Sequence, residues 1–168
     1  MERDMLFRSL SRCAATLMLA MLAATFALGA AACAPPEPTR DVELDDSAGV
    51  RGSDANSDGV RDDVAEVIEK LPVDAPMRSY LTESMVLEQR IMELDLTADP
   101  TELTEESYEI ASGVNDLITC PPAGLDASDA RTRAGQLRAL VSNTPERQSQ
   151  IAAFSALIDG RAFPAPSC

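Results

Sequence analysis

The sequence predicts an all-α fold, a small bundle of about five helices. In successive segments, apolar residues recur at spacings of three and four, which places them on one face of a helix. The segments are separated by helix start and stop signals: Asp or Thr before a first turn, and Pro or Gly after a last one. No segment alternates polar and apolar residues as a half-buried strand does.

Five segments fit the helical pattern, at about 62–71, 75–96, 101–118, 127–141 and 145–159. Pro72 stops the first, and Asp74 is placed to cap the second. Asp99-Pro100 and Thr144-Pro145 begin the third and the fifth, because Pro is favoured in a first helical turn. We expect the second helix to be the centre of packing, with small residues on the fourth and fifth allowing close approach.

A stripe of methionines on the second helix allows two interpretations. Met77, Met85 and Met92 all fall on or beside its apolar face. Such stripes usually face the core, which favours packing. The alternative is an adaptable binding groove, because methionine is flexible and polarisable.

The stretch that precedes the first helix has the pattern of a calcium loop. Oxygen-bearing side chains recur at every second position, followed by Gly59 where an EF-hand-type loop turns sharply. Oxygen-only donors suit a hard cation such as Ca²⁺. The predicted ligands are the side chains of Asp54, Asn56 and Asp58, the carbonyl of Val60, and a closing carboxylate from Asp62 or Asp63.

The loop resembles the short calcium loops of thrombospondin type 3 repeats, dockerins and the bacterial excalibur motif. Counted from Asp54, position 12 is Ala65, where an EF-hand carries a bidentate Glu. The string Asp58–Val64 also resembles one found in small helical secreted proteins of proteobacteria. The resemblance implies a weak structural calcium site, with a dissociation constant of about 10⁻⁴ to 10⁻³ M, and no activity.

A plain polar turn is the competing interpretation of the same residues. Asp62 or Asp63 would then cap the helix that follows, because a carboxylate in a first turn is stabilising without any metal. Capping and ligation are compatible roles.

The N-terminal 32 residues have the features of an export signal. Arg residues at the start precede a nearly continuous apolar run over 13–32, which ends in small residues. The stretch Leu28–Cys33 resembles a bacterial lipoprotein signal, and the resemblance implies that Cys33 becomes the lipidated mature N-terminus, with acyl chains such as palmitate. Ordinary signal cleavage and an uncleaved membrane anchor are the alternatives. By resemblance to lipoprotein sorting, Ala34 implies delivery to the outer membrane, facing the periplasm.

Residues 33–53 are predicted to be a flexible tether that follows the lipidated cysteine. Several Pro residues, a charged run and two Gly residues occur there without an apolar period. The helical domain is accordingly predicted to span residues 54–168, with the calcium loop at its start.

Cysteine counting predicts one disulfide. Cys13 would be removed with the signal and Cys33 would carry lipid, which leaves Cys120 and Cys168 as an even pair in an oxidising compartment. Cys168 lies in a Pro-rich tail with no core to join. The alternative is that Cys120 is a small buried residue.

The composition of the chain argues against several classes of function. A net charge of −14 opposes nucleic-acid binding, and the absence of His removes His-based triads and the usual zinc ligands. No Ser or Cys nucleophile has a visible base, so we expect no enzyme activity. The sequence favours a non-enzymatic lipoprotein of the cell envelope with a calcium loop and an envelope protein partner. The alternative is a periplasmic binder of a small molecule or peptide in a groove between helices, recognisable by an apolar cleft lined by Met77, Met85 or Met92.

Overall fold

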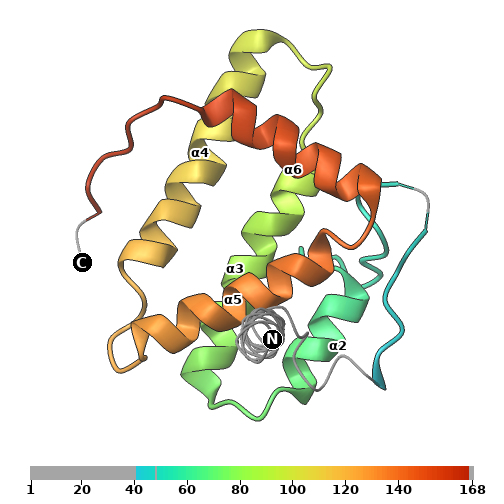
Figure 1. Ribbon diagram of the computed structural model, residues 1–168, viewed down its shortest axis with the longest axis vertical. Helices are drawn as coiled ribbons and strands as arrows, with labels where there is room; N and C mark the ends of the chain where they lie inside the picture. Colours follow the sequence, from blue (N-terminus) through green and yellow to red (C-terminus); the bar gives the residue numbers. More distant parts are fainter. Residues whose placement is uncertain (1–40, 48, 167–168) are drawn as a thin grey trace, which may run out of the picture. The chain divides into compact units, whose positions relative to one another are not determined.

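The computed structural model describes residues 41–47 and 49–166, and within them the chain is all-α (Figure 1). No strand occurs in this part of the chain, so the predicted fold class is confirmed. The helices are α2 (Asp62–Lys70), α3 (Ala75–Glu93), α4 (Pro100–Thr119), α5 (Ala127–Val141) and α6 (Pro145–Ile158).

The helices begin where the sequence signals placed them. The Asp74 carboxylate accepts from the Met77 amide at 3.0 Å, and Asp99 accepts from the Thr101 amide at 2.8 Å. Asp126 caps α5 and Thr144 caps α6 in the same way. These side chains satisfy amides that a helix cannot pair within its first turn.

The helices end on side chains that come from other parts of the chain. Long polar side chains donate to the last carbonyls: Arg78 at α2, Gln150 at α3, Arg131 at α4 and Arg61 at α5. The Gln150 amide, for example, lies 3.0 Å from the carbonyl oxygen of Ile91 and 2.8 Å from that of Leu94. Because these carbonyls have no partner within their own helix, the fold supplies one by tertiary contact.

Helix α3 is the centre of packing, as expected, and contacts each of the other four helices. One side of it joins a core with α2 and α5 that contains Tyr80, Leu81 and Met85. Its C-terminal half joins a second core with α4 and α6, around Ile110 and Phe154. The methionines of α3 are buried, so packing accounts for most of the stripe.

The segment made of residues 41–47 and 49–53 packs against the helices, so the prediction of a flexible tether is wrong for these residues. Val42 is buried in the first core, and Leu44 and Val50 pack against it. Gly52, with φ +70°, passes so close to the Arg61 side chain that any Cβ would collide with it. Among the described residues of the segment, three apolar side chains at uneven spacing reach the core, which explains why the sequence shows no apolar period there. The domain therefore begins before residue 54.

The predicted export signal, Cys33 and the first part of the tether lie outside the described residues. Within residues 41–47 and 49–166, no helix is both long and apolar enough to cross a bilayer. Export and anchoring therefore stay predictions from the sequence.

The C-terminal tail returns along α4 (Figure 1). Phe163 stacks on Tyr108 with the ring centroids 5.2 Å apart and the planes at 26°. Further along, Pro166 lines the same surface hollow as Cys120 at the end of α4. Cys168 lies outside the described residues, two positions beyond Pro166, so the pairing of Cys120 with Cys168 stays a prediction.

We expect Cys120 and Cys168 to be joined in the exported protein. Non-reducing peptide mapping checks this, and free thiols at both positions in protein taken from the periplasm would contradict it. Reduction is expected to lower the free energy of unfolding by about 4 kcal/mol, because the bond closes a long loop of the unfolded chain.

Candidate functional site

The loop that precedes α2 is curved around its own oxygen side chains. The two Asp54 carboxylate oxygens accept from the Asp58 amide at 3.2 Å and the Gly59 amide at 3.0 Å. The Asn56 side-chain oxygen accepts from the Asp58 amide at 3.1 Å, and Asp58 accepts from the Val60 amide at 2.9 Å. Short polar side chains that bond amides two to five residues ahead bend the backbone tightly.

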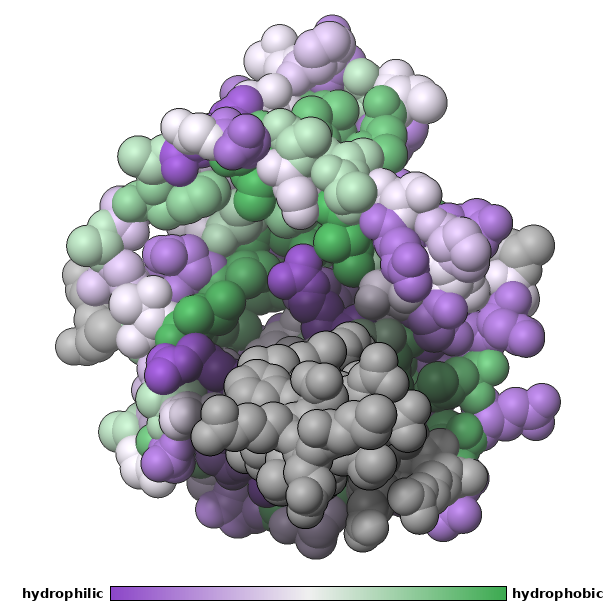
Figure 2. Space-filling model, viewed as in Figure 1, coloured by the Kyte–Doolittle hydropathy of each residue, from purple (hydrophilic) through white to green (hydrophobic). Residues whose placement is uncertain are grey.

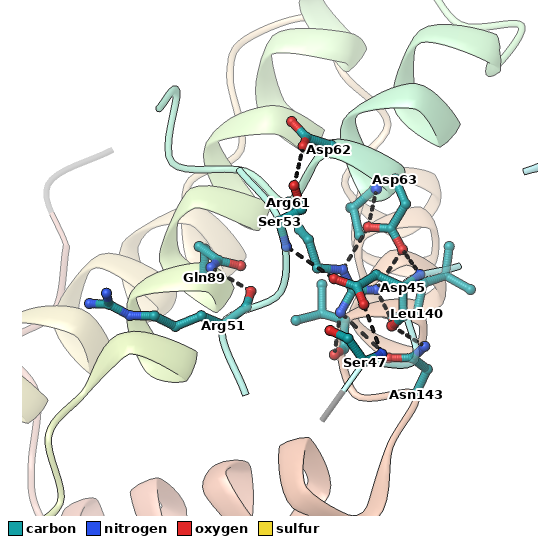
Figure 3. A network of polar contacts seen from close by, with 12 residues as sticks. Asp45, Ser47, Arg51, Ser53, Arg61, Asp62, Asp63, Gln89, Leu140 and Asn143 are labelled. Carbon is teal, nitrogen blue, oxygen red and sulfur yellow. Dashed lines mark hydrogen bonds and ion pairs between the residues drawn. The ribbon is translucent and has the colours of Figure 1, made fainter. Parts of the chain in front are cut away.

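Asp62 closes the base of the loop from its far end. Its carboxylate accepts from the Ser53 hydroxyl at 2.7 Å and from the Ala55 amide at 3.1 Å, and the Asp62 amide donates to the Ser53 carbonyl at 2.8 Å (Figure 3). The turn also uses positive φ values, +59° at Ser57 and +83° at Gly59. An added Cβ at Gly59 would meet only ordinary contacts, so the glycine is needed for its backbone conformation.

The side-chain oxygens of this loop are compatible with a bound calcium ion. Each carboxylate oxygen has two lone pairs, so one amide bond leaves room for a metal, and ligating carboxylates are commonly held by such bonds. The Asn56 amide group donates to the Asp58 carboxylate at 2.8 Å, so these two side chains already lie next to each other. Among the described residues no three acidic, His or Cys side chains already converge on one point, so binding requires these side chains to close inward.

Val60 and Asp62 are hydrogen-bonded within the loop, through the Val60 amide and the Asp62 carboxylate, whereas Asp63 makes no such bond. Its two oxygens lie 2.6 Å and 2.9 Å from the Arg61 guanidinium, and they also accept from the amides of Asp45 and Val64. The Asp63 side chain is buried and faces away from the loop. Of the two carboxylates predicted to close the site, only that of Asp62 bonds to the loop. The prediction of Asp63 as a calcium ligand does not fit this geometry, because its oxygens are paired with Arg61.

Asp63 belongs instead to a largely buried polar network, which we call the arginine clamp: Asp45, Arg61, Asp63, Asn143 and Arg147. All of its members except Arg147 are labelled in Figure 3. Arg61 is 1% exposed and Arg147 is fully buried. Arg61 donates to the last carbonyls of α5, at 3.1 Å to Leu140 and 3.3 Å to Val141. The positive end of this side chain thus meets the negative end of the helix dipole.

The second arginine of the clamp holds the segment 41–53. Arg147 donates to the carbonyls of Asp45 and Val50 and, at 2.6 Å, to the Asn143 side chain. It also forms an ion pair of 3.7 Å with the Asp45 carboxylate. Two guanidinium groups therefore face two carboxylates, and backbone carbonyls take up several of the other donors. Nη2 of Arg147 is buried and has no hydrogen-bond partner among the described residues, so only the ion pair with Asp45 compensates it.

Asp45 is held in its ionised form. Bonds from the Ser47 hydroxyl and amide lower the pKa of Asp45 to about 2, helped by the Ser53 amide and the charge of Arg147. Because the folded pKa lies below the ordinary value of 3.8, the contribution to stability is present above that value and is lost as the pH falls through about 2. Burial, with repulsion from Arg61, lowers the pKa of Arg147.

The sequence analysis missed the clamp, although one signal was available. Arg147, Ile151 and Phe154 follow each other at helical spacing, so Arg147 shares the inward face of α6. A charged residue on a buried face requires a partner, so this spacing indicates a buried ion pair.

A scan against protein-family models found no match, and searches of curated proteins and of solved structures found none either.

Asp63 belongs to the clamp and its neighbour Asp62 to the loop, so we expect their replacement to cost different amounts of stability. Asp63→Ala leaves the buried Arg61 guanidinium without its carboxylate, so we expect a loss of about 3–5 kcal/mol in the free energy of unfolding. Asp62→Ala removes bonds at the surface and is expected to cost about 1 kcal/mol or less. Urea denaturation of both variants measures the difference, and equal losses would contradict the assignment.

Proposed function

We propose that the protein is a non-enzymatic, lipid-anchored module of the cell envelope whose loop binds Ca²⁺ weakly. The observation that carries the calcium proposal is that Asp54, Asn56, Asp58 and Asp62 all engage one tightly curved loop. The site is proposed to be structural, and an envelope protein is the proposed partner.

The chain's own residues explain what an ion would do there. Asp54, Asp58 and Asp62 bring three negative charges to one short loop, and Asn56 adds a neutral oxygen. A bound cation offsets the repulsion among them, which orders the loop. Val60 and Arg61, which stand between Gly59 and Asp62 in the chain, are both 1% exposed. Because Val60 belongs to the core and Arg61 to the clamp, order in the loop extends directly to both.

Binding is proposed to be weak. Position 12 of the loop is Ala65, so the bidentate carboxylate of an EF-hand is absent. Such a site is half filled only near 10⁻⁴ to 10⁻³ M calcium, which is the range of extracellular modules.

No catalytic role is assigned to the buried charges. The Arg61 guanidinium is paired with the Asp63 carboxylate, and Arg61 and Arg147 both donate to backbone carbonyls. These charges therefore have a structural role.

The proposal of export and anchoring rests on the sequence of residues 1–33, through its resemblance to a lipoprotein signal.

Millimolar calcium is expected to raise the melting temperature of the full chain by a few degrees, because ligand at ten times its dissociation constant stabilises the folded state by about 1.4 kcal/mol. Magnesium at equal concentration is expected to do less, since it demands stricter octahedral geometry. Asp58→Ala and Asp62→Ala are expected to abolish the shift. The matched control is Asp159→Ala, an exposed aspartate far along the chain, which keeps it.

The calcium measurement is compared with sodium chloride of equal ionic strength. Calorimetry on the same samples reports binding directly. No calcium heat and no shift beyond the salt control at 10 mM, about ten times the weakest affinity proposed, would reduce the loop to a hydrogen-bonded turn.

Lipidation predicts that the mature protein starts at Cys33, carries acyl chains and partitions with membranes. Cys33→Ser is expected to be released or left unprocessed. Mass spectrometry of the N-terminus decides, and an unmodified start at Ala34 or beyond would rule the anchor out.

A further inference from the structure

A small apolar pocket lies between α3, α4 and α5. Its walls include Met85 and Leu87 from α3, Val114 and Leu117 from α4, and Ala134 from α5. Its volume is about 150 Å³. Figure 2 shows hydrophobic surface gathered in the hollow between these helices, with hydrophilic residues beside it.

The pocket exists because α5 presents small residues to α3 and α4. Ala134 and Gly135 stand where larger side chains would fill the space. An added Cβ at Gly135 would meet nothing within 4 Å. The small residues of this helix were expected to allow tight packing, and here they leave an opening instead.

One wall of this apolar pocket carries a buried carboxylate. Glu88 is 6% exposed, and one of its oxygens lies 3.3 Å from the Arg138 guanidinium. The other oxygen, Oε2, is buried and has no hydrogen-bond partner among the described residues. Burial raises the pKa of Glu88, and the charge of Arg138 opposes that shift. An unpaired buried carboxylate oxygen is costly, so it is a strong acceptor for any donor that enters.

We propose that this pocket binds a small apolar molecule of about six to eight non-hydrogen atoms that carries one hydrogen-bond donor, a hydroxyl or an amine, directed at Oε2 of Glu88. An enclosed apolar cavity of similar volume in another protein admits benzene, which sets the size. The apolar walls hold the hydrocarbon, and the carboxylate selects the donor. The proposal is independent of the calcium loop, which contributes no wall residue.

Arg138 has a positioning role in this site. Its ion pair fixes one oxygen of Glu88, a wall residue of the pocket, and leaves the other oxygen unpaired, while the side chain of Arg138 itself stays 42% exposed. Met85 supplies an adjustable wall, because its unbranched side chain adapts to the shape of a ligand. An apolar cleft beside Met85 is the feature expected of a small-molecule binder.

Phenol and toluene make a matched pair of probes, because they have nearly the same shape and differ in one donor. NMR titration of the full chain, followed at the methyl group of Met85, is expected to give an affinity for phenol at least about tenfold higher than for toluene. In Glu88→Leu the preference is expected to disappear. If that variant does not fold, Glu88→Gln serves, and its neutral oxygen is expected to reduce the preference without abolishing it.

A second pair of variants tests the pocket itself. Ala134→Leu fills it and is expected to weaken both probes at least about tenfold. Ala139→Leu makes the same change on an exposed position of the same helix outside the pocket, and is expected to alter neither affinity. Toluene binding as tightly as phenol, no saturable change at Met85, or undiminished binding in Ala134→Leu would each overturn the proposal.

Discussion

The buried ion pair of Arg61 and Asp63 is the interaction on which the rest of the structure depends. A charge taken out of water is costly unless its partner and its remaining hydrogen-bonding capacity are both supplied. Here the guanidinium receives a bidentate carboxylate and two carbonyls at the end of α5. The pair thereby joins the loop, the first residues of α2 and the corner between α5 and α6 at one point.

Long polar side chains take a role in this fold that short capping residues take elsewhere. Helices α3 to α6 begin on local Asp or Thr caps, whereas α2 to α5 end on long side chains that come from outside the helix itself. A helix end that depends on Gln150 or Arg61 is complete only when the whole bundle has assembled. The helices therefore depend on one another for more than their apolar faces.

The helices were predictable because their signals are local. Asp74, Asp99 and Thr144 act on amides two or three residues away, and a short stretch of sequence contains the whole interaction. The arginine clamp was not predictable in the same way, since it connects residues about 80 to 100 positions apart that resemble ordinary surface charges. The two neighbours Asp62 and Asp63 show the limit clearly, because one step along a helix start turns the side chain from the loop to the core.

The packing of residues 41–53 determines where the domain would feel a mechanical load. A load applied from the N-terminal side of residue 41 would first meet Val42 in the core and Asp45 against Arg147. Both contacts are made to the helical bundle, Val42 within the core of α2, α3 and α5, and Asp45 through Arg147 of α6. Such a load would therefore be shared by several helices from the start and would not act on α2 alone.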